Sequence, residues 1–372
     1  MNENHELKKM REGYGDAVID LAQKDEKIVF VGADSGGHER KWFFENAKER
    51  LIETGIAEAN SAVIAGALAS DGFKPFVLNF AYLHARMYNQ ISQSIAEDNY
   101  PVRMAGYYAG IWGFGGRSHN CITDLAFMRA LPNFNVFAAA DYWEAKTLVK
   151  KVASLDAPSY IRLSGVPTPT VHDSEPEFSP FRKHLDGKDC TIFCHGTMVH
   201  EALQACLEEK MNVSVINIPQ IKPLPKEEII SEAKITGGAV VVEEHSYIGG
   251  LAESISSLLS ENYPIPIKKV CVDDIFPVSV RMEEQNVYEK FGISTHQIKE
   301  AAKLIHGTVL EIGSGEGYGI KELAPKSTQY IAIDKYQTVI PNKLRKDYKI
   351  TFIQSEVPPL NDVEDNSIDF AV

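Results

Sequence analysis

The feature that most constrains the fold is an alternation of short apolar segments with helical stretches in the first 165 residues. The apolar segments have the length and composition of buried strands. They read IVFVGAD from Ile28, PFVLNF from Pro75, NVFAAA from Asn135 and SYIRLS from Ser159. Strands that alternate with helices predict a mostly parallel sheet covered on both faces. We therefore expect residues 1–165 to form an α/β domain.

A second alternation follows a break in the chain. Residues 166–188 begin with VPTPTVHDSEPEFSPF, whose prolines and charges predict a linker. Beyond it, the segments TIFCHG, NVSVINI, GAVVVEE and IKKVCV again alternate with helical stretches. This pattern predicts a second, smaller α/β domain over residues 189–303.

One carboxylate stands out within the first domain. The stretch GIAEANSAVIAGALA from Gly55 has apolar residues at helical spacing over much of its surface, with Glu58 in its first turn. An acidic residue there often only complements the helix dipole, which contributes about 0.3 to 1 kcal/mol. It can also serve as a working acid, and the surrounding sequence decides between the two.

Five stretches, in order, resemble the transketolase family of thiamine-diphosphate enzymes. They are GIAEANSAVIAGALASDGFKPF, FAYLHARMYNQI, GGRSHNCITDLAFMRALPNFNVFAAAD, PSYIRLS and VVVEEHSYIGGLAE. The resemblance implies that residues 1–165 are the pyrimidine-binding domain and residues 189–303 the family's C-terminal domain. It also implies that Glu58 is the catalytic glutamate, which hydrogen-bonds the aminopyrimidine ring of the cofactor. A neutral carboxyl in an apolar pocket would favour the imino form in which the cofactor's own amino group acts as a base.

The resemblance implies further cofactor-binding residues. Aligned without gaps on Arg86 and Gln90, Phe80 and Leu83 take the places where the family commonly has two aromatic residues against the pyrimidine ring. Leu83 is a departure, and an aromatic residue in NFAYL could equally belong to the core. His119 takes the place of a family side chain that reaches the substrate or the cofactor amino group, so we expect Glu58 and His119 to be catalytic.

Three other positions depart from the family pattern. Gly115 stands where sugar-using members carry an Asp for substrate hydroxyls, and Tyr107 stands where they carry a phosphate-contacting His. Gly165 stands where many members carry an Arg for the sugar phosphate. These departures predict a substrate other than an ordinary pentose phosphate. The charged candidates that remain near the mouth of the site are Arg162, Arg117 and His84.

A missing motif predicts a partner. Members of the family hold the diphosphate and its divalent metal in a separate domain with a GDG motif, and no GDG occurs in this sequence. The resemblance therefore implies the β-type half of a split enzyme, whose α-type subunit supplies the diphosphate-binding domain and Mg²⁺. We expect the active site to form at that interface, in a homodimer or a heterotetramer, with no metal ligand from this chain.

Three functions compete at this stage. The first is a split transketolase-like enzyme that transfers a two-carbon ketol or acyl unit. The second is a β-type subunit closer to the decarboxylase of 2-oxo-acid dehydrogenases or to deoxyxylulose-phosphate synthase. The third is a non-catalytic assembly subunit. The presence of Glu58 without the sugar contacts favours the first, with an altered substrate.

The last part of the chain carries a different pattern. HGTVLEIGSGEGYG from His306 reads as a strand that enters a Gly-rich turn, and YIAID reads as the next strand. An acidic residue at the end of that strand can take two ribose hydroxyls. The segment resembles the first third of a class I S-adenosylmethionine-dependent methyltransferase, a truncated Rossmann-like fold. The residues implied in S-adenosylmethionine binding are Glu311, Gly313, Gly315, Gly317 and Asp334.

We expect residues 304–372 to be a partial domain with two or three strands, in which NSIDFAV forms the next strand. A complete domain would need on the order of 100 further residues. The sequence is therefore expected to be a piece of a longer or frame-disrupted protein.

Composition excludes several classes of protein. The 372 residues carry a formal net charge of −13, which gives no electrostatic footprint for nucleic acid or an anionic membrane. The start of the chain lacks an apolar signal core, and no apolar run is long enough to span a bilayer. Five cysteines without metal-type spacing fit a reducing cytoplasm.

Overall fold

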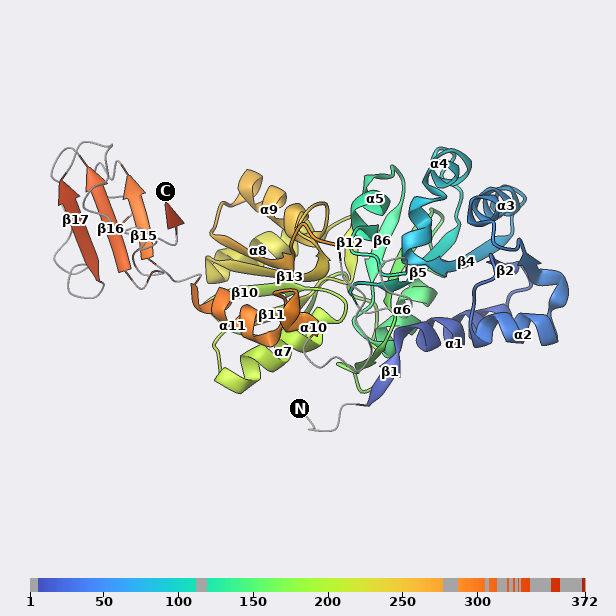
Figure 1. Ribbon diagram of the computed structural model, residues 1–372, viewed down its shortest axis with the longest axis horizontal. Helices are drawn as coiled ribbons and strands as arrows, with labels where there is room; N and C mark the ends of the chain where they lie inside the picture. Colours follow the sequence, from blue (N-terminus) through green and yellow to red (C-terminus); the bar gives the residue numbers. More distant parts are fainter. Residues whose placement is uncertain are drawn as a thin grey trace.

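Three larger sheets follow one another along the long axis of the molecule (Figure 1). The computed structural model describes residues 6–111, 119–276, 287–304, 308–312, 320, 324, 327, 329–334, 349–354 and 370–371. In the last part of the chain, the description of several strand residues extends to the backbone alone. No helix of the described residues is long and apolar enough to cross a membrane.

The first sheet has seven strands in the order β12-β6-β7-β5-β4-β2-β3. All neighbours are parallel except β12, which runs antiparallel to β6. The bounds are β2 (Ile28–Gly32), β3 (Leu51–Glu53), β4 (Lys74–Phe80), β5 (Arg103–Ala109), β6 (Asn135–Ala138), β7 (Ser159–Ser164) and β12 (Gln220–Lys222). The mostly parallel sheet and its four predicted strands are confirmed. The sequence did not indicate that β12, from beyond the linker, completes this sheet.

Helices cover both faces of the first sheet, as parallel strands require. One face carries α1 (Met10–Ala22), α2 (His38–Asn46) and α6 (Tyr142–Ala153), whose apolar residues share one core. The other face carries α3 (Glu58–Ser70), α4 (Tyr88–Ile91) and α5 (Asp124–Ala130). Helix α3 confirms the helix predicted from the stretch that follows Gly55, and Glu58 is its first residue.

The linker predicted over residues 166–188 contains two strands, of which β9 (Arg182–Leu185) belongs to the second sheet. β8 (Pro167–Pro169) pairs antiparallel with β1 (Leu7–Lys9), which leads directly into α1. Proline is tolerated here because this sheet has only two strands and both are edges. The pair therefore fastens the start of the chain beside the end of β7.

The second sheet has five strands in the order β14-β13-β10-β11-β9, parallel except for β9. Its strands are β9 (Arg182–Leu185), β10 (Thr191–Cys194), β11 (Ser214–Asn217), β13 (Ala239–Ser246) and β14 (Ile267–Val272). Its helices are α7 (Met198–Glu209), α8 (Lys226–Thr236), α9 (Leu251–Asn262), α10 (Val287–Lys290) and α11 (Thr295–Leu304). One apolar cluster contains Leu125 and Met128 of α5 together with Phe193 and Val241 of this sheet. The first two sheets therefore share a continuous core.

The third sheet is smaller and lies at one end of the molecule (Figure 1). Its parallel strands follow the order β17-β16-β15-β18. They are β15 (Thr308–Ile312), β16 (Gln329–Asp334), β17 (Ile350–Gln354) and β18 (Phe370–Ala371). The expectation of two or three strands was wrong, because β17 intervenes in the chain before NSIDFAV. Strand β18 then pairs with β15 on the opposite side from β16.

Candidate active site

The carboxyl edge of the first sheet carries Glu58, which was predicted to be catalytic, and Phe80, which was predicted to bind the cofactor. Glu58 begins α3 a few residues after β3 ends, and Phe80 is the last residue of β4. Tyr107 of β5 is the register partner of Phe80. Because parallel strands end at one edge of a sheet and ligands bind there in open α/β folds, this edge is the candidate site.

The Glu58 side chain is buried next to exposed apolar residues. Glu58 is 4% exposed, whereas Ile56 is 76% and Val63 is 42% exposed. Its Oε2 lies 3.8 Å from Nη1 of Arg86, whose side chain is largely in solvent. The buried carboxylate therefore lies close in sequence to exposed apolar residues, which are candidates for contact with another molecule.

Phe80 is at the centre of an aromatic cluster. Its ring centroid lies 4.4 Å from that of Tyr107, 5.5 Å from that of Tyr108 and 4.7 Å from the His119 ring, which meets it edge-on. The structure thus brings together Phe80 and His119, which the sequence placed only by resemblance. Burial raises the pKa of Tyr107 to about 12, so its phenol stays neutral near pH 7.

Gly165 has a local structural reason. A β-carbon at Gly165 would overlap the ring of Tyr108. Tyr108 itself has a φ of 57°, a left-handed conformation that non-glycine residues adopt at a cost of about 1 to 3 kcal/mol. The ring of Tyr108 therefore fills the space directly over the position where the family would carry an Arg.

Two charged candidates lie inside the protein instead of near the mouth. His84 is fully buried, with Nδ1 3.2 Å from the Phe80 carbonyl oxygen and its ring edge-on to Tyr160. Burial lowers the pKa of His84 to about 4, so the ring is neutral near pH 7. Arg162 is 4% exposed. Neither side chain is placed to meet a substrate charge at the surface.

Arg162 forms a buried ion pair. Its Nε donates to both carboxylate oxygens of Asp124, at 3.2 and 3.0 Å, and its Nη2 donates to the backbone oxygen of Glu244 at 2.7 Å. The Tyr160 hydroxyl donates to Asp124 at 3.0 Å. Although burial opposes the charge, Asp124 and Glu244 raise the pKa of Arg162. Arg162 therefore joins β7 to α5 and β13.

A cation that the sequence did not single out borders the aromatic cluster. The Arg11 guanidinium lies 4.3 Å from the centroid of the Tyr107 ring, and its Nη2 donates to the carbonyl oxygen of Gly36. Its Nε is buried with no hydrogen-bond partner among the described residues. The stretch MREGYG reads only as a helix start, so no sequence signal pointed to Arg11.

The remaining predicted residues are placed as follows. Leu83 and Gln90 are half-buried on the turn and helix after β4. Glu311 lies in β15 and Asp334 ends β16, both described by their backbone. The residues outside the described part of the chain are Gly115, Arg117, Gly313, Gly315 and Gly317.

The donor set at this edge fits a polar aromatic ring better than a metal. In the described part of the chain, Nδ2 of Asn79, Nε2 of His84 and Oδ1 of Asn120 are buried without a hydrogen-bond partner. These residues are sequence neighbours of site residues or contact them. Among the residues that the structure describes, no group of three His, Cys, Asp or Glu side chains could hold a metal ion. The edge therefore offers a carboxylate, an aromatic face and neutral polar groups.

Comparisons with known proteins agree with this geometry. Residues 7–165 match the transketolase pyrimidine-binding domain, and residues 181–298 match the transketolase C-terminal domain. The chain is 33% identical over 314 residues to the 6-deoxy-6-sulfo-D-fructose transketolase subunit SqwH of a Clostridium species, covering 81% of this chain and 97% of that protein. It is 31% identical over 303 residues to one subunit of the apulose-4-phosphate transketolase of Phocaeicola vulgatus, covering 78% and 96%.

A solved structure is also similar. It is titled as a split-gene transketolase in an inactive tetramer of β chains, with a TM-score of 0.72 and 37% identity, covering 79% of this chain and 97% of that one. The fold and these matches define a thiamine-diphosphate-type α/β protein, and the chain belongs to the transketolase family. Within that family it is the β-type half of a split transketolase-like transferase, which acts with a partner subunit.

Proposed function

We propose that this chain, joined to an α-type subunit, transfers a two-carbon ketol unit between substrates other than the common pentose phosphates. The observation that carries the proposal is the buried Glu58 carboxylate at the carboxyl edge of the first sheet, with the exposed apolar residues Ile56 and Val63 close to it in the sequence. A carboxylate in this setting lacks only the ligand and the surface that would cover it.

The residues at this edge fit the pyrimidine end of thiamine diphosphate. When bound, that cofactor supplies the electron sink for breaking and forming the carbon–carbon bond. Glu58 would hold a proton at a ring nitrogen, and Phe80 would pack against the ring face. His119, edge-on to Phe80, would donate or accept a hydrogen bond beside the reacting group. Positioned proton transfer of this kind typically contributes about 10² to 10⁴ in rate.

The aromatic cluster supports an altered substrate. Tyr107 is neutral near pH 7, and the ring of Tyr108 fills the space over Gly165. Arg11 is the nearby cation, with an unpartnered Nε among the described residues, and it would face an anionic group of the substrate. Two relatives are named for a sugar sulfonate and for a phosphate of apulose. We therefore propose an anionic ketose donor that does not need the pentose-phosphate contacts.

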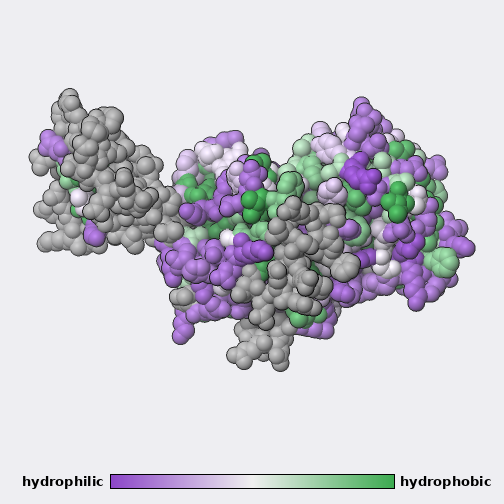
Figure 2. Space-filling model, in the orientation of Figure 1, coloured by the Kyte–Doolittle hydropathy of each residue, from purple (hydrophilic) through white to green (hydrophobic). Residues whose placement is uncertain are grey.

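Exposed apolar residues near Glu58 in the sequence support an α-type partner at this edge. Ile56 lies just before α3, and Val63 lies in its second turn. Figure 2 shows apolar patches among polar ones at the end of the molecule that carries α3. The similar solved structure, titled as an inactive tetramer of β chains alone, agrees with a need for the second subunit. We propose a heterotetramer in which the partner brings the diphosphate site and Mg²⁺.

Calorimetry and a coupled assay test the proposal. The isolated chain should bind thiamine diphosphate with Mg²⁺ only weakly, and it should not convert hydroxypyruvate and glycolaldehyde to erythrulose and CO₂. Addition of the α-type subunit should restore both binding and turnover. Micromolar cofactor binding by the isolated chain would contradict the split site. A best activity with xylulose 5-phosphate and ribose 5-phosphate would contradict the altered substrate.

A second function is proposed for residues 304–372, supported by the strand order of the third sheet. In order along the chain, β15 to β18 are arranged as 3-2-1-4, the order of a doubly wound dinucleotide-type fold. We propose that this segment derives from an S-adenosylmethionine-binding domain, with Asp334 at the end of the second strand on the ribose side. Among the described residues, β17 and β18 are open edges of this four-stranded sheet, so we expect the segment to be marginally stable. Tight S-adenosylmethionine binding that is lost in Asp334→Ala would show a competent module instead.

A further inference from the structure

The chain segment that carries His119 is held at its first end by a residue of the second domain. The backbone N–H of Ile111 donates to Oε1 of Glu244 at 2.7 Å, across 133 positions of sequence. Gly110 makes this approach feasible, because its φ is 104° and a β-carbon there would overlap the Glu244 carboxylate. The end of β5 therefore rests directly on β13.

The second end of the segment is held by the same strand. The N–H of Ser246, two residues after Glu244 in β13, donates to the carbonyl oxygen of Ile122 at 2.7 Å. The two ends also meet each other, since the N–H of Gly110 donates to the carbonyl oxygen of Cys121 at 2.7 Å. Asn120, the residue after His119, donates from Nδ2 to the carbonyl oxygen of Ile111 at 3.0 Å. The backbone next to His119 is therefore tied to residues that β13 holds.

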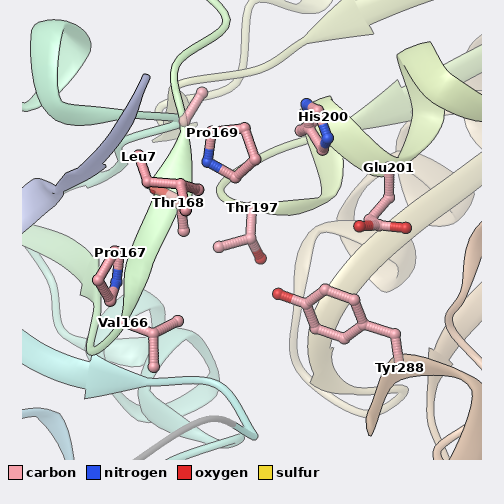
Figure 3. A pocket seen from close by; sticks show the side chains of 10 residues that line it. Leu7, Val166, Pro167, Thr168, Pro169, Thr197, His200, Glu201 and Tyr288 are labelled. Atoms are coloured by element: carbon pink, nitrogen blue, oxygen red, sulfur yellow. The ribbon is translucent and has the colours of Figure 1, made fainter. Parts of the chain in front are cut away.

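The Glu244 carboxylate is itself fixed. Its Oε2 accepts a hydrogen bond from Oγ1 of Thr197 at 2.7 Å. Figure 3 shows the Tyr288 hydroxyl pointing toward Thr197 beside a cavity of about 360 Å³ between the two domains. Glu244 is 2% exposed and Ile111 is fully buried. Both carboxylate oxygens therefore accept a hydrogen bond, one from Ile111 in the first domain and one from Thr197 in the second.

We infer that Glu244 is a positioning residue of the active site, through which the second domain sets the place of His119. The catalytic part of this inference rests on the proposed function. The structural part, the contact between Glu244 and Ile111, can be tested without any substrate.

The neighbouring residue provides a matched control. Glu243 is equally buried in β13 but accepts hydrogen bonds from the N–H groups of Leu251 and Ala252 at 2.8 and 2.9 Å, and it lies 3.3 Å from Nε2 of His195. All of these partners belong to the second domain. Loss of Glu243 therefore removes a buried carboxylate without touching the segment that carries His119.

Amide hydrogen exchange of the 372-residue chain tests the contact. In Glu244→Ala, the Ile111 amide should exchange at least about 10-fold faster, because it loses a charged acceptor. Glu244→Gln keeps an oxygen acceptor and should restore most of the protection. Glu243→Ala should raise exchange at Leu251 and Ala252 and leave Ile111 protected. Unchanged protection of Ile111 in Glu244→Ala would overturn the inference.

A further variant covers the case in which Glu244→Ala does not fold. Thr197→Val removes the donor that fixes Oε2 and keeps the charge and the Ile111 contact. Exchange at Ile111 should rise by about 3-fold or more, since the carboxylate that accepts from Ile111 loses the hydrogen bond that fixes its other oxygen. No change in this variant would likewise count against the positioning role.

Turnover of hydroxypyruvate and glycolaldehyde by the complex with the α-type subunit tests the catalytic part. Glu244→Ala should lower kcat at least about 10-fold with thiamine-diphosphate binding unchanged, and Glu244→Gln should recover it. Glu243→Ala should lower the thermal midpoint with kcat unchanged. Equal kcat in Glu244→Ala and Glu243→Ala would overturn the role. A wild-type complex without turnover would instead overturn the proposed function. The rate of amide exchange at Ile111 would still test the contact with Glu244.

Discussion

The carboxyl edge around Glu58 and the seam between the first two sheets, made by Asp124, Arg162 and Glu244, both bury carboxylates, but they satisfy them differently. In the seam, each charged group has hydrogen-bond partners of this chain at 2.7 to 3.2 Å. At the edge, Glu58 has Arg86 at 3.8 Å and exposed apolar neighbours. The charges of the seam are paired within one chain, whereas the edge is where we propose that the cofactor and the partner subunit bind.

The largest expected effect is on the seam. Arg162→Met leaves Asp124 as a buried charge without its partner, which typically costs about 3 to 5 kcal/mol of unfolding free energy. Arg86→Met is the matched control, because the Arg86 side chain is 61% exposed and such ion pairs contribute about 0 to 1 kcal/mol. Denaturant unfolding of both variants measures the difference. Similar losses would show that the two regions do not differ as described.

Glu58 should give the opposite result. Glu58→Gln keeps the shape of the side chain and loses the proton that a carboxyl can share. In the complex with the α-type subunit, we expect turnover of hydroxypyruvate to fall by at least about 10²-fold, with the thermal midpoint of the chain nearly unchanged. Normal turnover would mean that the carboxylate only begins a helix.

Lowering the pH should reduce the stability of the folded chain through His84, which lies beside Phe80 and Tyr160. Its pKa in the folded chain, about 4, is below the ordinary value of 6.5. The unfolded chain therefore takes up the proton first as pH falls, and stability is lost progressively from near pH 7 toward pH 4. Unfolding measured at pH 7 and pH 5 should show a smaller drop in His84→Leu than in the wild-type chain. An equal drop would assign the acid sensitivity to other buried histidines.

The smallest expected effect concerns the substrate. Tyr108→Ala removes the ring over Gly165 and should raise kcat/KM for xylulose 5-phosphate relative to hydroxypyruvate by about 10-fold, the scale at which pocket shape discriminates. Tyr82→Ala, which changes an exposed aromatic residue nearby, should leave that ratio unchanged. An unchanged ratio in Tyr108→Ala would show that this ring does not determine which substrate is preferred.

The sequence predicted the parts that are encoded locally. Strands such as β4 and β7 are continuous apolar runs, and α3 follows from its periodicity, so these elements could be placed without coordinates. Strand β17 was missed because ITFIQ is short and lies among charged residues. Family resemblance placed Phe80 and His119 but could not show that their rings touch.

The rest depends on contacts between distant residues. Nothing in IRLS indicates that Arg162 would be buried against Asp124, 38 positions away. The sequence predicts a lost phosphate contact at Gly165, but it does not show that the ring of Tyr108, a residue with left-handed backbone, lies directly over this position. Glu244 was one of two adjacent acids in VVVEEHSYIGGLAE, and only the fold distinguishes the one that reaches Ile111. In each case the deciding information is long-range.

The seventh strand of the first sheet, β12, has a consequence for synthesis of the chain. It lies at residues 220–222, after three strands of the second sheet (β9, β10 and β11), yet it covers the edge of β6. Until β12 has been synthesised, the edge of β6 has no partner strand. An unpaired strand edge of this kind can pair with the wrong segment or with another chain. Cutting the protein at the linker would leave the edge of β6 permanently unpaired. The two domains are therefore separate in sequence but depend on each other to complete the first sheet.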